Sequence, residues 1–164
     1  MKAKCLARYI TMSVGLDLTT FWNTTWHHYI WWDLGLFRNT FPADPISPTQ
    51  PQAAYYVLRT LCTLLESAKP ATTAVEFTNK DTKFEVDAFR LPDGATLVGV
   101  WIPDEPVDQS PSVVTDIRFP DVKFTRAAGI DSLNGTEREL KISDGCLAGM
   151  IVKDYPIFVR LTGA

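Results

Sequence analysis

The spacing of apolar residues divides the chain into a first part with helical periodicity and a second part with strand periodicity. Apolar residues recur every three or four positions over 2–14 and again over about 50–66, which predicts two amphipathic helices. Gly15 is expected to end the first helix. Between the helices, the segment 16–22 carries apolar or β-branched residues at both alternating sets of positions, and this pattern predicts a short strand covered on both faces.

From residue 74 onward the apolar period changes to two. Eight such segments predict strands, at 74–79, 83–91, 95–103, 112–119, 122–130, 138–142, 147–153 and 157–161. Turn-forming residues such as Asn134-Gly135 separate them. Short strands at even spacing are typical of an antiparallel sandwich or barrel. The segment 95–103 is apolar on both faces, so we expect it to be the central strand, with Trp101 in the core.

A Pro-containing stretch separates the two parts. Residues 67–73 include Pro70 and predict a linker after the second helix. The sequence therefore predicts a helix–strand–helix domain over 1–69 and a β-sandwich domain over 70–164.

Aromatic residues gather in the segment 21–41. Four of the five tryptophans lie there, at Trp22, Trp26, Trp31 and Trp32. Tryptophan combines a large apolar surface with a polar N–H, so this density favours a concave ligand site. A small packed core beneath a long loop is the alternative, and composition leaves both open.

Charge and cysteine content exclude some classes of protein. The net charge of −3 and the pI near 5.3 argue against a nucleic-acid partner. No apolar run is long enough to predict a membrane span. The three cysteines fit neither a disulfide framework nor a zinc site, and we expect free thiols in packed positions.

Neither a metal nor a cofactor is predicted. His27 and His28 are adjacent and point opposite ways in an extended segment, whereas a two-histidine metal site needs both on one side. No cofactor fingerprint is present, and the compartment stays open.

The order of the motifs resembles one known family. KAKCLARYITMSVGLD (2–17), TTFWN (19–23), WWDLGLF (31–37) and PQAAYYVLRTLCTLLE (51–66) resemble the last units of the (β/α)8 barrel of clan-A retaining glycoside hydrolases, of xylosidase/iduronidase-like or cellulase-like type. The resemblance implies the seventh helix over 2–14, the eighth strand over 16–22 and the eighth helix over 52–66. The strands that follow, ending in DYPIFVRL, resemble the small β-sandwich that trails the barrel in those enzymes.

This resemblance implies a carbohydrate ligand. In such enzymes a tryptophan at the end of the eighth strand lies beneath the sugar beside the cleaved bond, and Trp22 holds that position. Sites in these barrels form at the C-terminal ends of the strands, where Trp22 and Asn23 are expected. Trp26, His28 and Asp33 are further substrate-binding candidates. Asp33 either accepts hydrogen bonds from sugar hydroxyls or caps backbone N–H groups of the loop.

The resemblance does not supply catalytic residues. Retaining hydrolysis uses two carboxylates about 5–5.5 Å apart. In the family these lie on the fourth and seventh strands, which would precede Met1. The pairs Glu85 with Asp87 and Glu137 with Glu139 lie on alternating strands, where polar faces are usually solvated.

The sequence therefore predicts a C-terminal fragment of a glycosidase that carries no catalytic carboxylates. Its expected partners are a carbohydrate and the missing N-terminal barrel portion. Two alternatives remain: a stand-alone carbohydrate-binding β-sandwich protein, and a purely structural sandwich.

Overall fold

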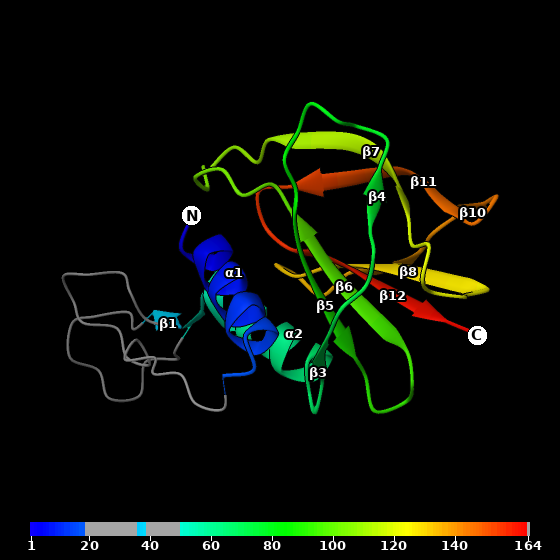
Figure 1. Ribbon diagram of the computed structural model, residues 1–164. Coiled ribbons are helices and arrows are strands. Elements are labelled where there is room, and N and C mark those ends of the chain that lie inside the picture. Colours follow the sequence, from blue (N-terminus) through cyan, green and yellow to red (C-terminus); the bar gives the residue numbers. More distant parts are fainter. Residues whose placement is uncertain (19–35, 39–49, 164) are drawn as a thin grey trace, which may run out of the picture.

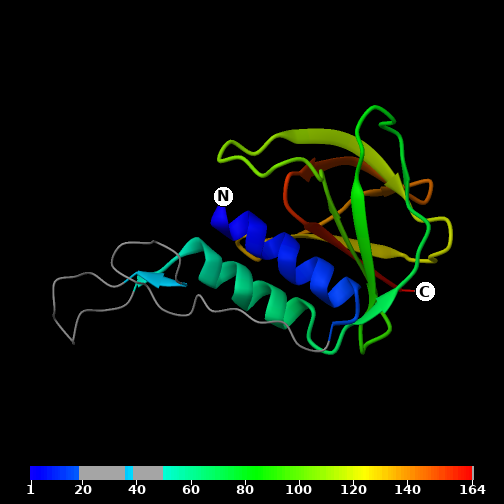
Figure 2. The same cartoon turned by 60° about the vertical axis from the view of Figure 1, so that its left-hand side comes forward.

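The computed structural model describes residues 1–18, 36–38 and 50–163. Two helices, α1 (Lys2–Gly15) and α2 (Ala53–Leu64), pack beside each other on one face of a β-sandwich (Figure 1). From a second side, the helices, the larger sheet and the smaller sheet form three successive layers (Figure 2). None of the described helices is long and apolar enough to span a membrane.

The larger sheet has six strands in the order β3-β5-β6-β12-β8-β9. They are β3 (Lys69–Ala71), β5 (Glu85–Arg90), β6 (Thr96–Trp101), β12 (Ile157–Thr162), β8 (Arg126–Asp131) and β9 (Glu137–Glu139). The smaller sheet has the order β10-β11-β7-β4. Its strands are β10 (Ile142–Ser143), β11 (Cys146–Lys153), β7 (Ser112–Arg118) and β4 (Glu76–Phe77).

A separate short pairing joins β1 (Phe37–Arg38) to β2 (Gln50–Pro51). Every strand pairing within the described residues is antiparallel. The chain is thus mostly β and sandwich-like, as its period-two pattern predicts.

The larger sheet is buried on both faces. Its inner face packs on the smaller sheet, where Val98, Val159 and Ile117 belong to one apolar cluster. Its outer face packs on the helices, where Phe89 and Phe158 belong to a second apolar cluster. All six residues of β6 are buried, and β6 lies between β5 and β12. The prediction of a central strand with Trp101 in the core is confirmed.

The predicted strand over 16–22 is wrong at its start. Leu16 and Asp17 form a turn that closes α1, and Leu18 has no regular secondary structure. The N–H of Asp17 donates to Val14 O at 3.0 Å, and that of Leu18 donates to Ser13 O at 3.0 Å. With Asp17 at φ 56°, this is a Schellman closure. Residues 19–22 lie outside the described residues, so no helix–strand–helix unit is shown.

Gly15 does not end α1 through a positive φ, because that position belongs to Asp17. Gly15 is instead the last residue of the helix, and a Cβ there would lie 2.7 Å from Asp87 Oδ1. The glycine therefore permits a close approach between α1 and β5.

Other differences from the predicted elements follow from tertiary pairing. The predicted linker over 67–73 contains β3, which pairs with β5. The second helix begins at Ala53 and not at 50, because Gln50 and Pro51 pair with the chain at 37–38. All three cysteines are free, as expected, but Cys5 and Cys62 are exposed and not packed.

Candidate functional site

The residues predicted to bind a sugar lie outside the described residues. They are Trp22, Asn23, Trp26, His28 and Asp33. Their role stays a prediction. Leu36, within the described range 36–38, is buried, and its carbonyl accepts a hydrogen bond from the Gln52 N–H at 2.8 Å.

An open groove lies between the C-terminal half of α2 and the larger sheet. Its volume is about 720 Å³. One wall is the polar side of α2, with Arg59, Thr60 and Thr63, and the other is the β8–β9 turn, with Asn134 and Gly135. The base is apolar and is formed by Leu64, Leu91 and Ile130.

Both ends of the groove are fixed by contacts that the fold imposes. At one end the β8–β9 turn approaches α2 so closely that a Cβ at Gly135 would lie 3.0 Å from Thr60 Oγ1. Gly135 also has φ +72°, a conformation that other residues rarely adopt. At the other end, Arg160 of β12 forms an ion pair with Asp93 of the β5–β6 turn.

The Asp93 carboxylate at the end of the groove is stabilised in its ionised form. Asp93 accepts hydrogen bonds from the Ala95 N–H and from Arg160, and together these lower the pKa of its carboxyl. Asp93 therefore stays ionised at neutral pH. Arg160 Nε is buried and has no hydrogen-bond partner in the part of the chain that the structure describes.

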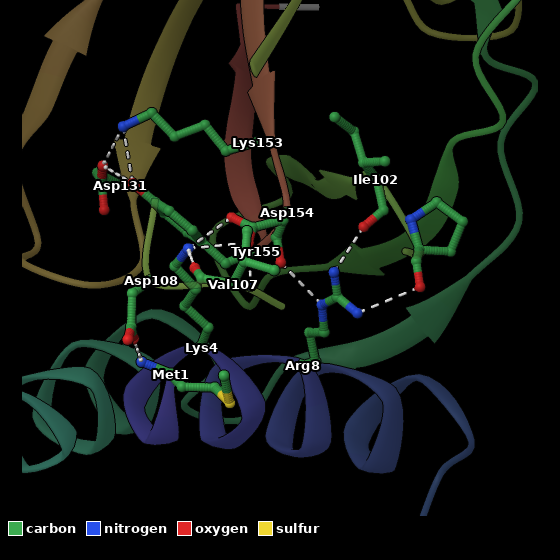
Figure 3. Close-up of polar contacts among 11 residues, drawn as sticks. Met1, Lys4, Arg8, Ile102, Val107, Asp108, Asp131, Lys153, Asp154 and Tyr155 are labelled. Carbon is green, nitrogen blue, oxygen red and sulfur yellow. Dashed lines mark hydrogen bonds and ion pairs between the residues drawn. The ribbon is translucent and has the colours of Figure 1, made fainter. Parts of the chain in front are cut away.

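A second polar cluster joins α1 to the sandwich, and we call it the helix anchor: Lys4, Arg8, Val107 and Asp154 (Figure 3). Lys4 Nζ donates to both carboxylate oxygens of Asp154, at 2.9 and 2.8 Å. It also donates to Val107 O. The Val107 N–H in turn donates to Asp154 Oδ2 at 3.1 Å. Both charges are buried, and each is neutralised by the other.

Within the helix anchor, Arg8 lies one turn after Lys4 on the same side of α1. Its Nε donates to Asp154 O at 2.9 Å, and its two terminal nitrogens donate to the carbonyls of Ile102 and Pro103 (Figure 3). Burial lowers the pKa of Arg8, while Asp154 acts in the opposite direction. The guanidinium thus ties one turn of α1 to three backbone carbonyls of the sandwich.

Tyr155 connects this cluster to β8. Its hydroxyl donates to Asp131 Oδ2 at 2.9 Å and accepts a hydrogen bond from Lys153 Nζ at 2.7 Å. Burial, followed by the nearby Asp131 charge, raises the pKa of Tyr155. Each charged group here has a partner, so the arrangement is suited to holding elements together and not to proton transfer.

Sequence reasoning missed the helix anchor. The predicted apolar stripe of α1 contains Ala7 and Ile10, and the structure buries both. It also buries Lys4, Thr11 and Ser13. The available signal was the spacing of Lys4, Arg8 and Thr11 at i, i+4 and i+7, which lines them along one side of the helix.

The two carboxylate pairs differ in the structure. Glu137 and Glu139 are exposed, as expected for a solvated face. Glu85 and Asp87 are half-buried, which differs from that expectation because the C-terminal end of α1 lies against Asp87. Asp87 Oδ2 is buried and has no hydrogen-bond partner among the described residues.

The side of α1 that faces away from the sheet is apolar as well. We call this the outer face of α1: Cys5, Tyr9, Met12 and Leu16, which follow one another at i, i+4, i+7 and i+11. All four are exposed, and Leu18 continues the exposed apolar surface beyond the helix. No charged residue interrupts this line.

Comparison with known proteins adds no identification. No protein-family model matches the chain, and no curated protein matches its sequence. Within residues 1–18, 36–38 and 50–163, no group of three or more His, Cys, Asp or Glu side chains is placed to hold a metal ion.

Proposed function

We propose that this chain is the C-terminal part of a (β/α)8-barrel retaining glycoside hydrolase. In this proposal the aromatic segment supplies one wall of the sugar-binding site, through Trp22 and Asn23. The β-sandwich buttresses the barrel, and the catalytic carboxylates lie in an N-terminal barrel portion that is missing here. The motif order described above is the source of the proposal.

The observation that carries it is the outer face of α1. An ordinary surface helix is apolar on one side and polar on the other. α1 buries Ala7 and Ile10 against the sandwich, yet Met12 is 49% exposed and Leu16 is 71% exposed on the opposite side. A helix that is apolar on both sides is suited to lie between two layers. A barrel portion packed on the outer face would provide the second layer.

The helix anchor supports the buttressing role. A sandwich can brace a barrel only if it is fixed to the barrel's helices. Lys4 and Arg8 fix α1 to the 102–108 segment and to Asp154 through buried, charge-assisted hydrogen bonds. The second apolar cluster adds Phe89 and Phe158 to the same contact.

Activity measurements test the proposal directly. The chain alone should hydrolyse no aryl glycoside, since both carboxylates of the retaining mechanism are elsewhere. Turnover by the purified chain that disappears when one of its own carboxylates is changed would refute the proposal.

Joining the chain to its barrel portion provides the positive test. Trp22→Ala in the longer protein should lower kcat/KM by about tenfold or more and leave the unfolding midpoint unchanged, because a sugar platform acts on substrate and not on packing. Trp101→Ala is the matched control. Trp101 is buried, so this variant should lose stability instead. Loss of stability alone in Trp22→Ala would instead favour a packing role.

A stand-alone carbohydrate-binding β-sandwich is the second candidate. The observation in its favour is that both faces of the larger sheet are covered within the described residues, one by the smaller sheet and the other by α1 and α2. This candidate predicts a stable monomer whose tryptophan fluorescence shifts with oligosaccharide. The barrel-part proposal predicts poor solubility, because Met12 and Leu16 stay exposed when the barrel portion is absent.

A further inference from the structure

The groove between α2 and the β8–β9 turn is large enough to hold a small ligand. Its volume of about 720 Å³ falls in the range of about 300–1,000 Å³ typical of small-molecule sites. Its walls are held by a helix and a sheet, and its ends by the Gly135–Thr60 approach and the Asp93–Arg160 ion pair. It therefore does not depend on loop rearrangement to exist.

The polar groups of the groove alternate between donors and acceptors. Arg59 and Arg160 donate, Glu66 and Glu137 accept, and hydroxyl or amide groups of Thr60, Thr63, Ser67 and Asn134 do both. Within the described residues, Arg59, Glu66 and Glu137 form no salt bridge. The guanidinium of Arg59 lies over the Tyr56 ring, 5.5 Å from its centroid, which leaves the N–H groups at its edge for a ligand.

The charges of the groove nearly cancel. Arg160 and Asp93 are already paired with each other, which leaves Arg59 with Glu66 and Glu137 as the charges that face a ligand. A phosphate or carboxylate ligand would meet those two acids, and a cationic ligand would meet Arg59. A sugar hydroxyl donates and accepts at once and carries no charge, so it matches both sets of groups.

We infer that this groove binds a neutral carbohydrate chain, at a site separate from the aromatic segment. The inference goes beyond the proposed function, because either a glycosidase part or a stand-alone binding protein could carry such a groove. No aromatic side chain among the described residues lines it, so the sugar is bound by hydrogen bonds to solvated side chains, and we expect weak affinity, on the order of millimolar.

The test is a nuclear magnetic resonance titration of the 164-residue chain. The probes are neutral cello-, xylo-, malto- and manno-oligosaccharides, with inorganic phosphate as the anionic probe. At least one oligosaccharide should shift the backbone amide signals of Thr60, Thr63, Asn134 and Gly135. Indole N–H signals report the tryptophans separately, so binding at the aromatic segment is distinguishable from binding in the groove.

Variants assign the shifts to the groove. Arg59→Ala combined with Glu137→Ala removes two exposed side chains from opposite walls and should weaken binding about tenfold. The matched control is Arg118→Ala combined with Glu76→Ala, an exposed pair that lies directly opposite across β7 and β4 of the smaller sheet. The control should bind as the unchanged chain does.

Three results would overturn the inference. The first is no shift of the groove amides with any oligosaccharide at tens of millimolar concentration. The second is a shift confined to the indole signals, which would support the aromatic wall of the proposed function and remove the groove. The third is a groove response to phosphate but to no oligosaccharide, which would make it an anion site.

Discussion

At the scale of single residues, Asp87 is poorly matched to its surroundings. Its Oδ2 is buried with no hydrogen-bond partner among the described residues, and its Oδ1 lies against Gly15 in the last turn of α1. A helix C-terminus presents carbonyl oxygens and partial negative charge, which disfavours a carboxylate. Burial, followed by the nearby Glu85, raises the pKa of Asp87.

Asp87→Asn should therefore stabilise the chain at neutral pH. A carboxyl whose pKa is raised by folding binds its proton more readily in the folded state, so the folded state loses stability as the pH rises from the unfolded pKa through the folded pKa. The variant should have a higher free energy of unfolding at pH 7 than the unchanged chain, and this gain should shrink toward pH 4.

Urea unfolding at the two pH values measures this effect. Glu105→Gln is the control, since Glu105 is exposed and its replacement should change stability at neither pH. An Asp87→Asn variant that is less stable than the unchanged chain at pH 7 would show that the carboxylate has a stabilising partner.

At the scale of elements, the helix anchor decides how α1 is held. Lys4 and Asp154 are both buried, and each is the other's only counter-charge within hydrogen-bonding distance in the described residues. Removing one member of a buried pair leaves an uncompensated charge, which costs about 3–5 kcal/mol.

Lys4→Met should accordingly lower the free energy of unfolding by about 3–5 kcal/mol. Adding Asp154→Asn to it should recover part of this loss, because the neutral amide can still accept from the Val107 N–H. Denaturant unfolding of the two single variants and the double variant gives the coupling energy.

Lys83→Met is the control for that series. The Lys83–Glu85 pair is 3.2 Å long but largely exposed. Exposed pairs contribute about 0–1 kcal/mol, so this variant should be close to neutral. Equal losses in Lys4→Met and Lys83→Met would contradict the role of burial.

Elements were predictable where a periodic pattern was long enough. α1, α2 and strands such as β6 and β12 each present at least six residues of consistent periodicity. β3 and β10 have three and two residues, and β3 contains Pro70, which argues against a strand unless it lies at a sheet edge. Such strands form because they pair with β5 and β11, and their own sequences do not predict them.

The described binding features were not predictable for a related reason. Arg59 and Asn134 each have an unremarkable local context, the polar side of a helix and a turn, and only the docking of α2 on the sheet brings them to one groove. Likewise Lys4 and Asp154 are 150 positions apart. Which charges pair at that separation depends on how α1 docks on the sandwich, and the local sequence around either residue does not predict it.

At the scale of the whole molecule, the outer face of α1 departs from an ordinary surface. Met12 and Leu16 lie on it, Leu18 follows them beyond the helix, and all three are exposed. Contiguous exposed apolar surface promotes association. The sheets contribute little to this, because their edges are the short strands β3, β9, β4 and β10.

Met12→Lys should therefore reduce self-association of the isolated chain. Sedimentation velocity over a range of protein concentrations measures the effect, and the variant should remain monomeric to a concentration about tenfold higher. Val114→Lys is the control, since Val114 is equally apolar and 63% exposed but lies on the smaller sheet. Association relieved by Val114→Lys and not by Met12→Lys would place the contact on the sandwich.

The helix anchor also determines the order in which the chain can mature during synthesis. Lys4 leaves the ribosome long before Asp154. In the larger sheet β12 joins β6 to β8, and β12 is the last of the described strands to be translated. Until then, α1 has α2 and β5 as packing partners but lacks Phe158 of β12 and its charge partner Asp154. A nascent chain of this kind depends on slow, non-local closure and on protection from aggregation while translation is completed.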